Sequence, residues 1–185
     1  MTGMRAWRSG RGRVADRRHT KDRGDLTEME FILASARRGY VVGKPYGDNE
    51  HYDLMVDARR RLWRVQVKLS GARHHRGFTV RSSWRTSRKQ IAYSVRDIDF
   101  LVVLIEGHGI WYVIPVRALG GRLTIHLYPF GSRRGSSNRF EKYREAWCLL
   151  EGKRVRVSRG RTEGTADGSA LGANGDKRGF HGKFL

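Results

Sequence analysis

The sequence predicts a single domain of the α/β or α+β class, with a mixed central β-sheet flanked by helices. Three observations support this prediction. A helical pattern of apolar residues opens the domain, a series of short apolar or alternating segments follows it, and a second helical pattern closes it. The 185 residues are enough for one ordinary domain with additional segments at both ends.

The first helix is expected in DLTEMEFILASARRGY, residues 25–40. Its apolar stripe recurs at helical spacing and consists of Leu26, Met29, Ile32, Leu33 and Ala36. Such a stripe is typical of the helix face that packs on a core. Gly39 is a natural C-cap for this helix.

Alternating or continuous apolar runs predict the strands of the sheet. The expected strands are residues 40–42, 52–57, 62–70, 78–80, 99–105, 110–116 and 122–130. The two runs on either side of EGHG, residues 106–109, are expected to form a hairpin. Residues 86–95 are compatible with either a short helix or a loop. The apolar side of NRFEKYREAWCLL, residues 138–150, predicts the closing helix.

Both ends of the chain differ in composition from this central part. Residues 1–24 are rich in Arg and Gly and show no periodicity, which indicates a flexible basic arm. Residues 152–185 are Gly-rich and polar, which indicates a disordered tail. The folded domain is therefore expected at residues 25–151.

The net charge of +20 and the pI of about 11.2 favour a polyanionic partner, because neutralising phosphates releases condensed counterions. Nucleic acid is the first candidate, and an anionic membrane surface is the second. The single cysteine, Cys148, excludes a disulfide within the chain and a zinc site of paired cysteines. The sequence shows neither a secretory signal pattern nor an apolar run long enough to span a bilayer, so a cytoplasmic location is expected.

The expected hairpin of the second and third strands brings three polar side chains together. If the loop after Asp57 has four residues, Asp57 pairs with Leu62, and Asp53 lies opposite Gln66. Asp53, Gln66 and Lys68 then share one face of the hairpin. A loop of five residues would move Asp53 off this face.

These groups suit metal-assisted hydrolysis of a phosphodiester. Mg²⁺ prefers a few hard oxygen ligands and keeps several waters. Asp53, the side-chain oxygen of Gln66 and the backbone carbonyl of Val67 can supply such ligands. Lys68 can orient the attacking water or stabilise the negative charge that develops in the transition state. Taken singly, Asp53 also suits a turn, and Lys68 also suits the solvent-exposed face of a strand. Only their joint placement favours a catalytic role.

The first helix offers a further carboxylate, from Glu28 or Glu30. Each glutamate also fits a capping box, in which Asp25 or Thr27 is the N-cap residue. From the pattern alone, a capping role and a role in the site remain open for both.

Tyr52-Asp53, a strand–turn–strand unit and Gln66-Val67-Lys68 resemble the signature of the PD-(D/E)XK nuclease superfamily. GDLTEME, RGYVVGKPYGDNEHYDLMVD, DIDFLVVLIEGHGIWYVIPV and RFEKYREAW, between residues 24 and 148, look like the branch that includes a homing endonuclease encoded in a group I intron. The resemblance implies a restriction-endonuclease-like core and a DNA endonuclease that depends on Mg²⁺ or Mn²⁺. It also implies the catalytic residues Glu28, Asp53, Gln66 and Lys68, with Glu28, Asp53 and Gln66 as metal ligands.

The departure from the superfamily is Gln66, where most members carry Asp or Glu, although the homing-endonuclease branch also has Gln there. A neutral amide is a weaker ligand for Mg²⁺ than a carboxylate. The alternative is therefore a non-catalytic module of the same fold that binds DNA or structured RNA.

A basic segment follows the third strand and is expected to bind the DNA backbone, although it also suits a loop that only faces water. Its expected phosphate contacts are Arg73, Arg76, Arg81, Arg85, Arg88 and Lys89. Trp84 is the candidate for stacking on a base or sugar. Because cutting both strands of a duplex needs two active sites, a homodimer or homotetramer is expected.

Overall fold

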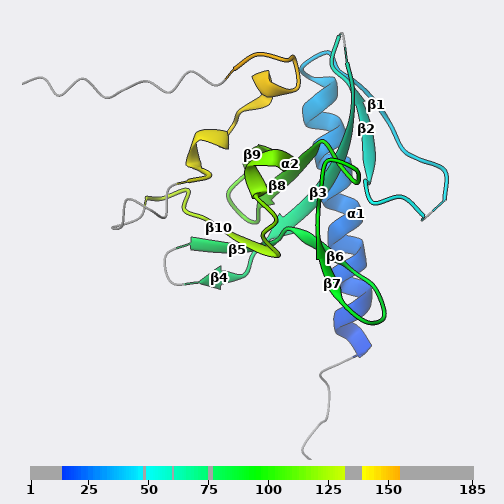
Figure 1. The fold of residues 1–185 in the computed structure, drawn as a ribbon, viewed down its shortest axis with the longest axis vertical. Helices are drawn as coiled ribbons and strands as arrows, with labels where there is room; N and C mark the ends of the chain where they lie inside the picture. The colour runs from blue at the N-terminus through cyan, green and yellow to red at the C-terminus, as the bar shows by residue number, and fades with distance from the viewer. Residues whose placement is uncertain (1–13, 48, 60, 75–76, 132–138, 155–185) are drawn as a thin grey trace, which may run out of the picture.

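The structure is a computed structural model that describes residues 14–47, 49–59, 61–74, 77–131 and 139–154. Its centre is a five-stranded sheet with the strand order β1-β2-β3-β8-β9 (Figure 1). These strands are β1 Val41–Gly43, β2 Leu54–Asp57, β3 Leu62–Ser70, β8 Phe100–Ile105 and β9 Ile110–Pro115. β3 and β8 run parallel, whereas the other neighbours run antiparallel, which confirms the expected mixed sheet.

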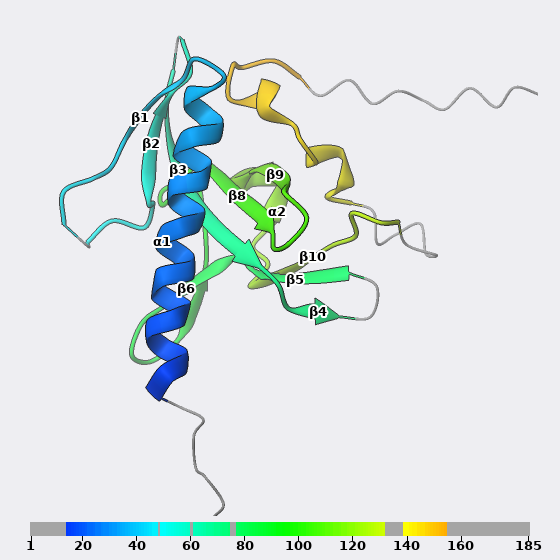
Figure 2. The same cartoon turned by 180° about the vertical axis from the view of Figure 1, so that it is seen from behind.

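Two smaller sheets extend from this centre. One contains β10 Thr124–Leu127, β5 Gly77–Arg81 and β4 Arg73–His74, and the other is the hairpin of β6 Ser83–Arg85 and β7 Gln90–Ala92. The segment that suited either a helix or a loop therefore contains a strand, β7. The long helix α1, Val14–Ala36, runs along the central sheet, and the short helix α2, Val116–Leu119, follows β9 (Figures 1 and 2). Within the described ranges, no helix has the length and apolar character needed to cross a membrane.

Hydrophobic clusters cover both faces of the central sheet. Successive residues of β8 alternate between them: Phe100, Val102 and Leu104 join the cluster that includes Phe31 of α1, and Leu101, Val103 and Ile105 join the opposite one. A strand that is covered on both faces has no polar face. This explains why the continuous run FLVVLI forms a strand without alternation.

α1 begins earlier than expected. It starts at Val14, so the flexible arm predicted for residues 1–24 is wrong for residues 14–24, and residues 1–13 lie outside the described residues. The segment from 14 to 36 contains no proline and many residues that are acceptable in a helix. A helix that is nucleated where it packs on the sheet can therefore propagate back through this basic segment. The predicted tail also lies outside the described residues from 155 onward.

α1 also buries the face opposite to the one that was expected. From residue 21 onward, the buried side chains of α1 are Thr27, Phe31 and Ser35. The ring of Phe31 stacks on Trp147 at 5.6 Å between centroids and lies 5.7 Å from Trp111. One large aromatic side chain between two small ones lets the helix approach the sheet closely. The predicted stripe, Leu26, Met29, Ile32, Leu33 and Ala36, is exposed.

The segment after residue 138 does not form the expected closing helix. It forms two short 3₁₀ helices, η2 Glu141–Tyr143 and η3 Trp147–Leu149. Between them, Glu145 has a positive φ of 49°, and its backbone N–H donates to the carbonyl of Trp111 at 2.8 Å. The Glu145 carboxylate accepts from the N–H of Trp111 at 2.7 Å. These bonds to β9 replace helical hydrogen bonds and interrupt the helix.

The orientation of α1 gives a prediction about stability. Phe31→Ala should lower the free energy of unfolding by about 3–5 kcal/mol, because it empties a fully buried aromatic site. Met29→Ala on the opposite face should cost less than about 1 kcal/mol. Urea denaturation in dilute solution measures both. Equal losses for the two variants would contradict this orientation of α1, and a larger loss for Met29→Ala would mean that α1 is turned the other way.

Candidate active site

β3 extends beyond its pairing with β2, so the last residues of β3 have no strand partner on the β2 side. Asp57 pairs with Leu62 and Leu54 with Val65, which confirms the register expected from a four-residue loop. Asp53 comes immediately before β2, and its backbone N–H donates to the carbonyl of Val65 at 3.0 Å. β3 continues beyond this point without pairing to β2. The Asp53 side chain therefore lies beside an open strand edge.

The carboxylate of Asp53 takes the place of the missing strand. Its Oδ2 accepts the backbone N–H of Val67 at 2.8 Å and also accepts a bond from the side-chain nitrogen of Gln66. Among the described residues, no hydrogen bond uses Oδ1 of Asp53. One oxygen is thus fixed to β3, and the other is available to a ligand.

Gln66 presents its amide nitrogen, and not its oxygen, to Asp53. Its Oε1 accepts a hydrogen bond from the hydroxyl of Tyr93 at 3.2 Å, and both residues are buried. Burial and the carboxylates of Asp53 and Asp97 raise the pKa of Tyr93, so its hydroxyl stays protonated. This differs from the expectation that the Gln66 oxygen binds metal, which would require the amide to turn over.

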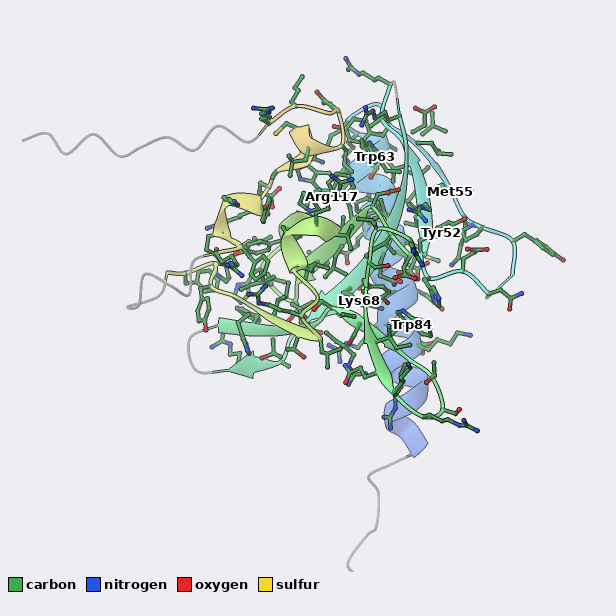
Figure 3. All side chains as sticks on the ribbon, in the orientation of Figure 1. Tyr52, Met55, Trp63, Lys68, Trp84 and Arg117 are labelled. Carbon is green, nitrogen blue, oxygen red and sulfur yellow. The ribbon has the colours of Figure 1, made fainter. Side chains whose placement is uncertain are left out.

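Lys68 follows Gln66 on the same face of β3 and is labelled in Figure 3. Burial lowers the pKa of Lys68, while Asp53 and Glu28 oppose this effect; Arg81 lowers it further. Burial likewise raises the pKa of the Asp53 carboxyl, which the positive charge of Lys68 opposes. Asp53 and Lys68 therefore each offset part of the cost of desolvating the other.

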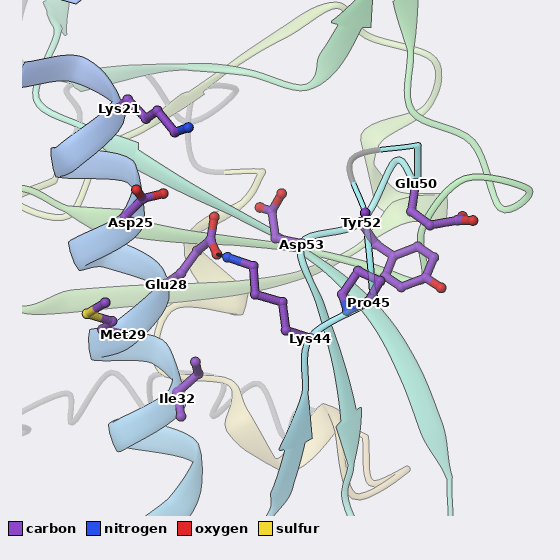
Figure 4. A pocket seen from close by; sticks show the side chains of 11 residues that line it. Lys21, Asp25, Glu28, Met29, Ile32, Lys44, Pro45, Glu50, Tyr52 and Asp53 are labelled. Carbon is purple, nitrogen blue, oxygen red and sulfur yellow. Dashed lines mark hydrogen bonds and ion pairs between the residues drawn. The ribbon is translucent and has the colours of Figure 1, made fainter. Parts of the chain in front are cut away.

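Glu28 enters the site from α1 (Figure 4). Its Oε2 accepts a hydrogen bond from Lys44 Nζ at 2.8 Å, and this contact raises the pKa of Lys44. Glu30 is exposed and lines neither of the pockets that contain Asp53. Because α1 begins at Val14, both glutamates lie inside the helix, which excludes the capping role.

Glu28 and Asp53 line two adjoining pockets. The first has a volume of about 610 Å³ and is also lined by Gln66 and Lys68. The second has a volume of about 510 Å³ and lies on the side of Lys44, as Figure 4 shows. The two carboxylates can therefore be reached from both sides.

The oxygen atoms at this junction fit a hard divalent cation. Mg²⁺ is commonly held by one or two carboxylates and keeps several waters, and Glu28, Asp53 and the Val67 carbonyl offer such a set. No preformed group of three or more His, Cys, Asp or Glu side chains is found in the described part of the chain. Lys44 now pairs with Glu28, and a cation bound there would compete with it.

Most of the expected DNA-binding residues are exposed around the β6–β7 hairpin and β5. These are Arg73, Arg81, Arg85, Arg88 and Lys89, whereas Arg76 lies outside the described residues. The ring of Trp84, the candidate for stacking on a base, stacks on His51 at 4.1 Å between centroids. Its Nε1 is buried and has no hydrogen-bond partner in the described residues. One ring face on which a base was expected to stack is thus already covered.

Sequence reasoning missed Lys44 and Tyr93. Lys44 lies in the segment GKP after β1, and Tyr93 lies in the segment whose conformation was left open. The Lys44 segment carries part of the family resemblance, but no pattern singled out either residue. Only tertiary packing brings these two residues to Glu28 and Gln66.

Comparisons with known proteins show what the chain is similar to. A family model for the PD-(D/E)XK endonuclease matches residues 18–150. The structure of the bacterial homing endonuclease I-Ssp6803I is similar with a TM-score of 0.64 and 34% sequence identity, over 72% of this chain and 94% of that chain. The Holliday junction resolvase Hjc of Archaeoglobus fulgidus has a TM-score of 0.40 and 14% identity, over 60% of this chain and 90% of that chain. No curated protein sequence matches the chain.

The family match extends over most of the chain and includes Glu28, Asp53 and the Gln66-Val67-Lys68 segment of β3. The restriction-endonuclease-like fold class is confirmed with it. The chain belongs to the PD-(D/E)XK endonuclease family.

Proposed function

We propose that the chain is a metal-dependent endonuclease that hydrolyses phosphodiester bonds in DNA. The observation that carries this proposal is the contact of Asp53 with Gln66 and Val67, next to Glu28 and Lys68. Polar and partly buried groups with shifted pKa values, gathered in one pocket, are typical of a catalytic site. I-Ssp6803I is named as a homing endonuclease, which supports DNA as the substrate.

In this proposal, Glu28, Asp53 and the backbone carbonyl of Val67 hold Mg²⁺ or Mn²⁺. Such an ion lowers the pKa of a bound water and polarises the phosphate when it is present. Lys68 holds a proton on Nζ beside the reacting group and stabilises the negative charge that develops there, or orients the attacking water.

Gln66 has a positioning role in this proposal. It donates from Nε2 to Oδ2 of Asp53 and so leaves Oδ1 for the metal. Tyr93 supports this orientation, because its protonated hydroxyl donates to Oε1 of the amide. Direct coordination by the Gln66 oxygen, the role expected from the sequence, would require the amide to give up both contacts.

The exposed basic residues around β5, β6 and β7 are proposed to bind the phosphates on either side of the cleaved bond. Each phosphate that they neutralise releases counterions and makes binding depend on salt. Cleavage of both strands requires two copies of the site, which a homodimer or homotetramer supplies.

Asp53→Asn and Lys68→Ala should each slow Mg²⁺-dependent nicking of supercoiled plasmid by at least about 100-fold. The first removes a negative charge that holds the metal ion, and the second removes the positive charge that stabilises the transition state. Asp53→Asn should also raise the melting temperature at pH 7. Burial raises the pKa of this carboxyl, so its ionised form costs stability above the folded pKa. Below a pH of about 3.9, the pKa of this carboxyl in the unfolded chain, the cost should vanish. The difference in melting temperature between Asp53→Asn and the wild type should vanish with it.

Plasmid nicking by both variants at the wild-type rate would overturn the catalytic assignment. If the wild-type chain binds DNA in a salt-sensitive way but never nicks it with Mg²⁺ or Mn²⁺, the non-catalytic binding module is the correct function. A comparison of DNA with RNA of the same sequence distinguishes the two nucleic acids as ligands.

Tyr93→Phe should weaken Mn²⁺ binding by about tenfold or more in calorimetry, because it frees the amide that orients Asp53. Tyr112→Phe is the matched control, since the Tyr112 hydroxyl is also buried but bonds Glu141, at 2.6 Å. In a Gln66→Leu background, Tyr93→Phe should not weaken Mn²⁺ binding any further. Unchanged Mn²⁺ binding by Tyr93→Phe would overturn the supporting role of Tyr93, and tighter binding would favour Gln66 as a direct ligand.

The combined change Arg85→Ala and Arg88→Ala should reduce the slope of log affinity against log salt concentration by about two, one for each lost phosphate contact. Arg117→Ala on α2 removes an exposed charge away from the β6–β7 hairpin and should leave the slope unchanged (Figure 3). Fluorescence anisotropy with labelled duplex measures both. Equal slopes for all three proteins would place the DNA on another surface.

A further inference from the structure

The outward face of α1 is apolar along two turns. Leu26 is 58% exposed, Met29 62%, Ile32 37% and Leu33 51%. At 3.6 residues per turn, these side chains form one stripe on the side of the helix opposite to Phe31. Figure 2 shows α1 crossing the front of the molecule with no described element over it. A contiguous apolar stripe of this kind marks an interaction surface.

We propose that this stripe, defined as Leu26, Met29, Ile32 and Leu33, is the contact through which two copies of the chain associate. The second copy presents the same stripe, so the contact is self-complementary about a two-fold axis. The four apolar side chains suit neither DNA phosphates nor water.

The charges at the two ends of the stripe favour an antiparallel pairing of the α1 helices. Asp22 lies before the stripe, Arg37 lies after it, and both are exposed. The midpoint between Leu26 and Leu33 is also the midpoint between Asp22 and Arg37. A two-fold axis at this midpoint places Leu26 opposite Leu33 of the second copy, and Asp22 opposite Arg37. A parallel pairing would bring like charges together instead.

The size of the stripe sets the strength of this contact. Four half-exposed side chains bury on the order of a few hundred Å² per copy, less than the roughly 800 Å² per partner of a standard interface. The free chain should therefore associate weakly and reversibly. Two copies held on one duplex have a high effective concentration, and the same contact then becomes sufficient.

The stripe also adjoins the candidate active site. Met29 and Ile32 line the same pocket as Glu28 and Asp53 (Figure 4). Pairing through α1 therefore brings both sites close to a common two-fold axis. This use of the contact on DNA rests on the proposed nuclease function, whereas self-association of the free chain does not.

Sedimentation velocity of the full chain without metal or DNA tests the contact separately from any nuclease activity. The wild-type chain should show a monomer–dimer equilibrium as its concentration rises, and Leu33→Glu should raise the dissociation constant at least about tenfold, because it buries a charge. Leu123→Glu is the matched control, since Leu123 is 43% exposed outside α1, and it should dimerise like the wild type.

Charge exchange tests the antiparallel arrangement. Asp22→Arg or Arg37→Asp alone should weaken the dimer, and the two changes together should restore it, because each copy then presents the reversed pair. A wild-type chain that stays monomeric at every concentration would overturn the proposal, as would equal association of Leu33→Glu and Leu123→Glu. Single exchanges that weaken the dimer without rescue by the double exchange would overturn the antiparallel pairing.

Discussion

The unequal lengths of β2 and β3 are the constraint on which the site depends. β2 has four residues and β3 has nine, so the end of β3 has no neighbouring strand on the β2 side. A buried N–H of Val67 left unpaired there would cost about 1–3 kcal/mol. The Asp53 carboxylate satisfies this donor, and it also faces the pocket. One side chain thus completes the sheet and supplies the central acidic group of the site.

Each carboxylate of the site lies near a lysine. Lys44 faces Glu28 on one side, and Lys68 is coupled to Asp53 on the other. The protein supplies its own counterions to carboxylates that burial would otherwise destabilise. The site therefore holds negative charge without a preformed cage of acidic groups. The exposed positive charges lie farther out, where they suit the backbone of a nucleic acid.

The sequence predicted those features of the structure that depend on residues close together in the chain. The register of Asp53 against Gln66 followed from an assumed four-residue loop, and the burial of β8 followed from its unbroken apolar run. The contacts of Tyr93 and Lys44 depend on segments distant in sequence, so neither pattern nor spacing contained them. Glu145 interrupts the last helix for the same reason, because its partner is Trp111.

The prediction of which face of α1 is buried was wrong for a different physical reason. Periodicity identifies an apolar face but does not say which partner covers it, and in this chain the sheet takes Phe31 between two small polar residues. The apolar stripe then remains for a contact outside the monomer. The helical pattern left Glu28 and Glu30 open, and only the family resemblance selected Glu28, which lines the same pockets as Asp53.

The two pockets that meet at Glu28 and Asp53 have a consequence for the order of events during turnover. In the single chain, a nucleic-acid strand that filled the pocket beside Lys68 would leave the opening beside Lys44 uncovered. Small ions and solvent molecules can then exchange at the carboxylates while the polymer stays in place. Entry of metal ions and water would then not depend on release of the nucleic acid.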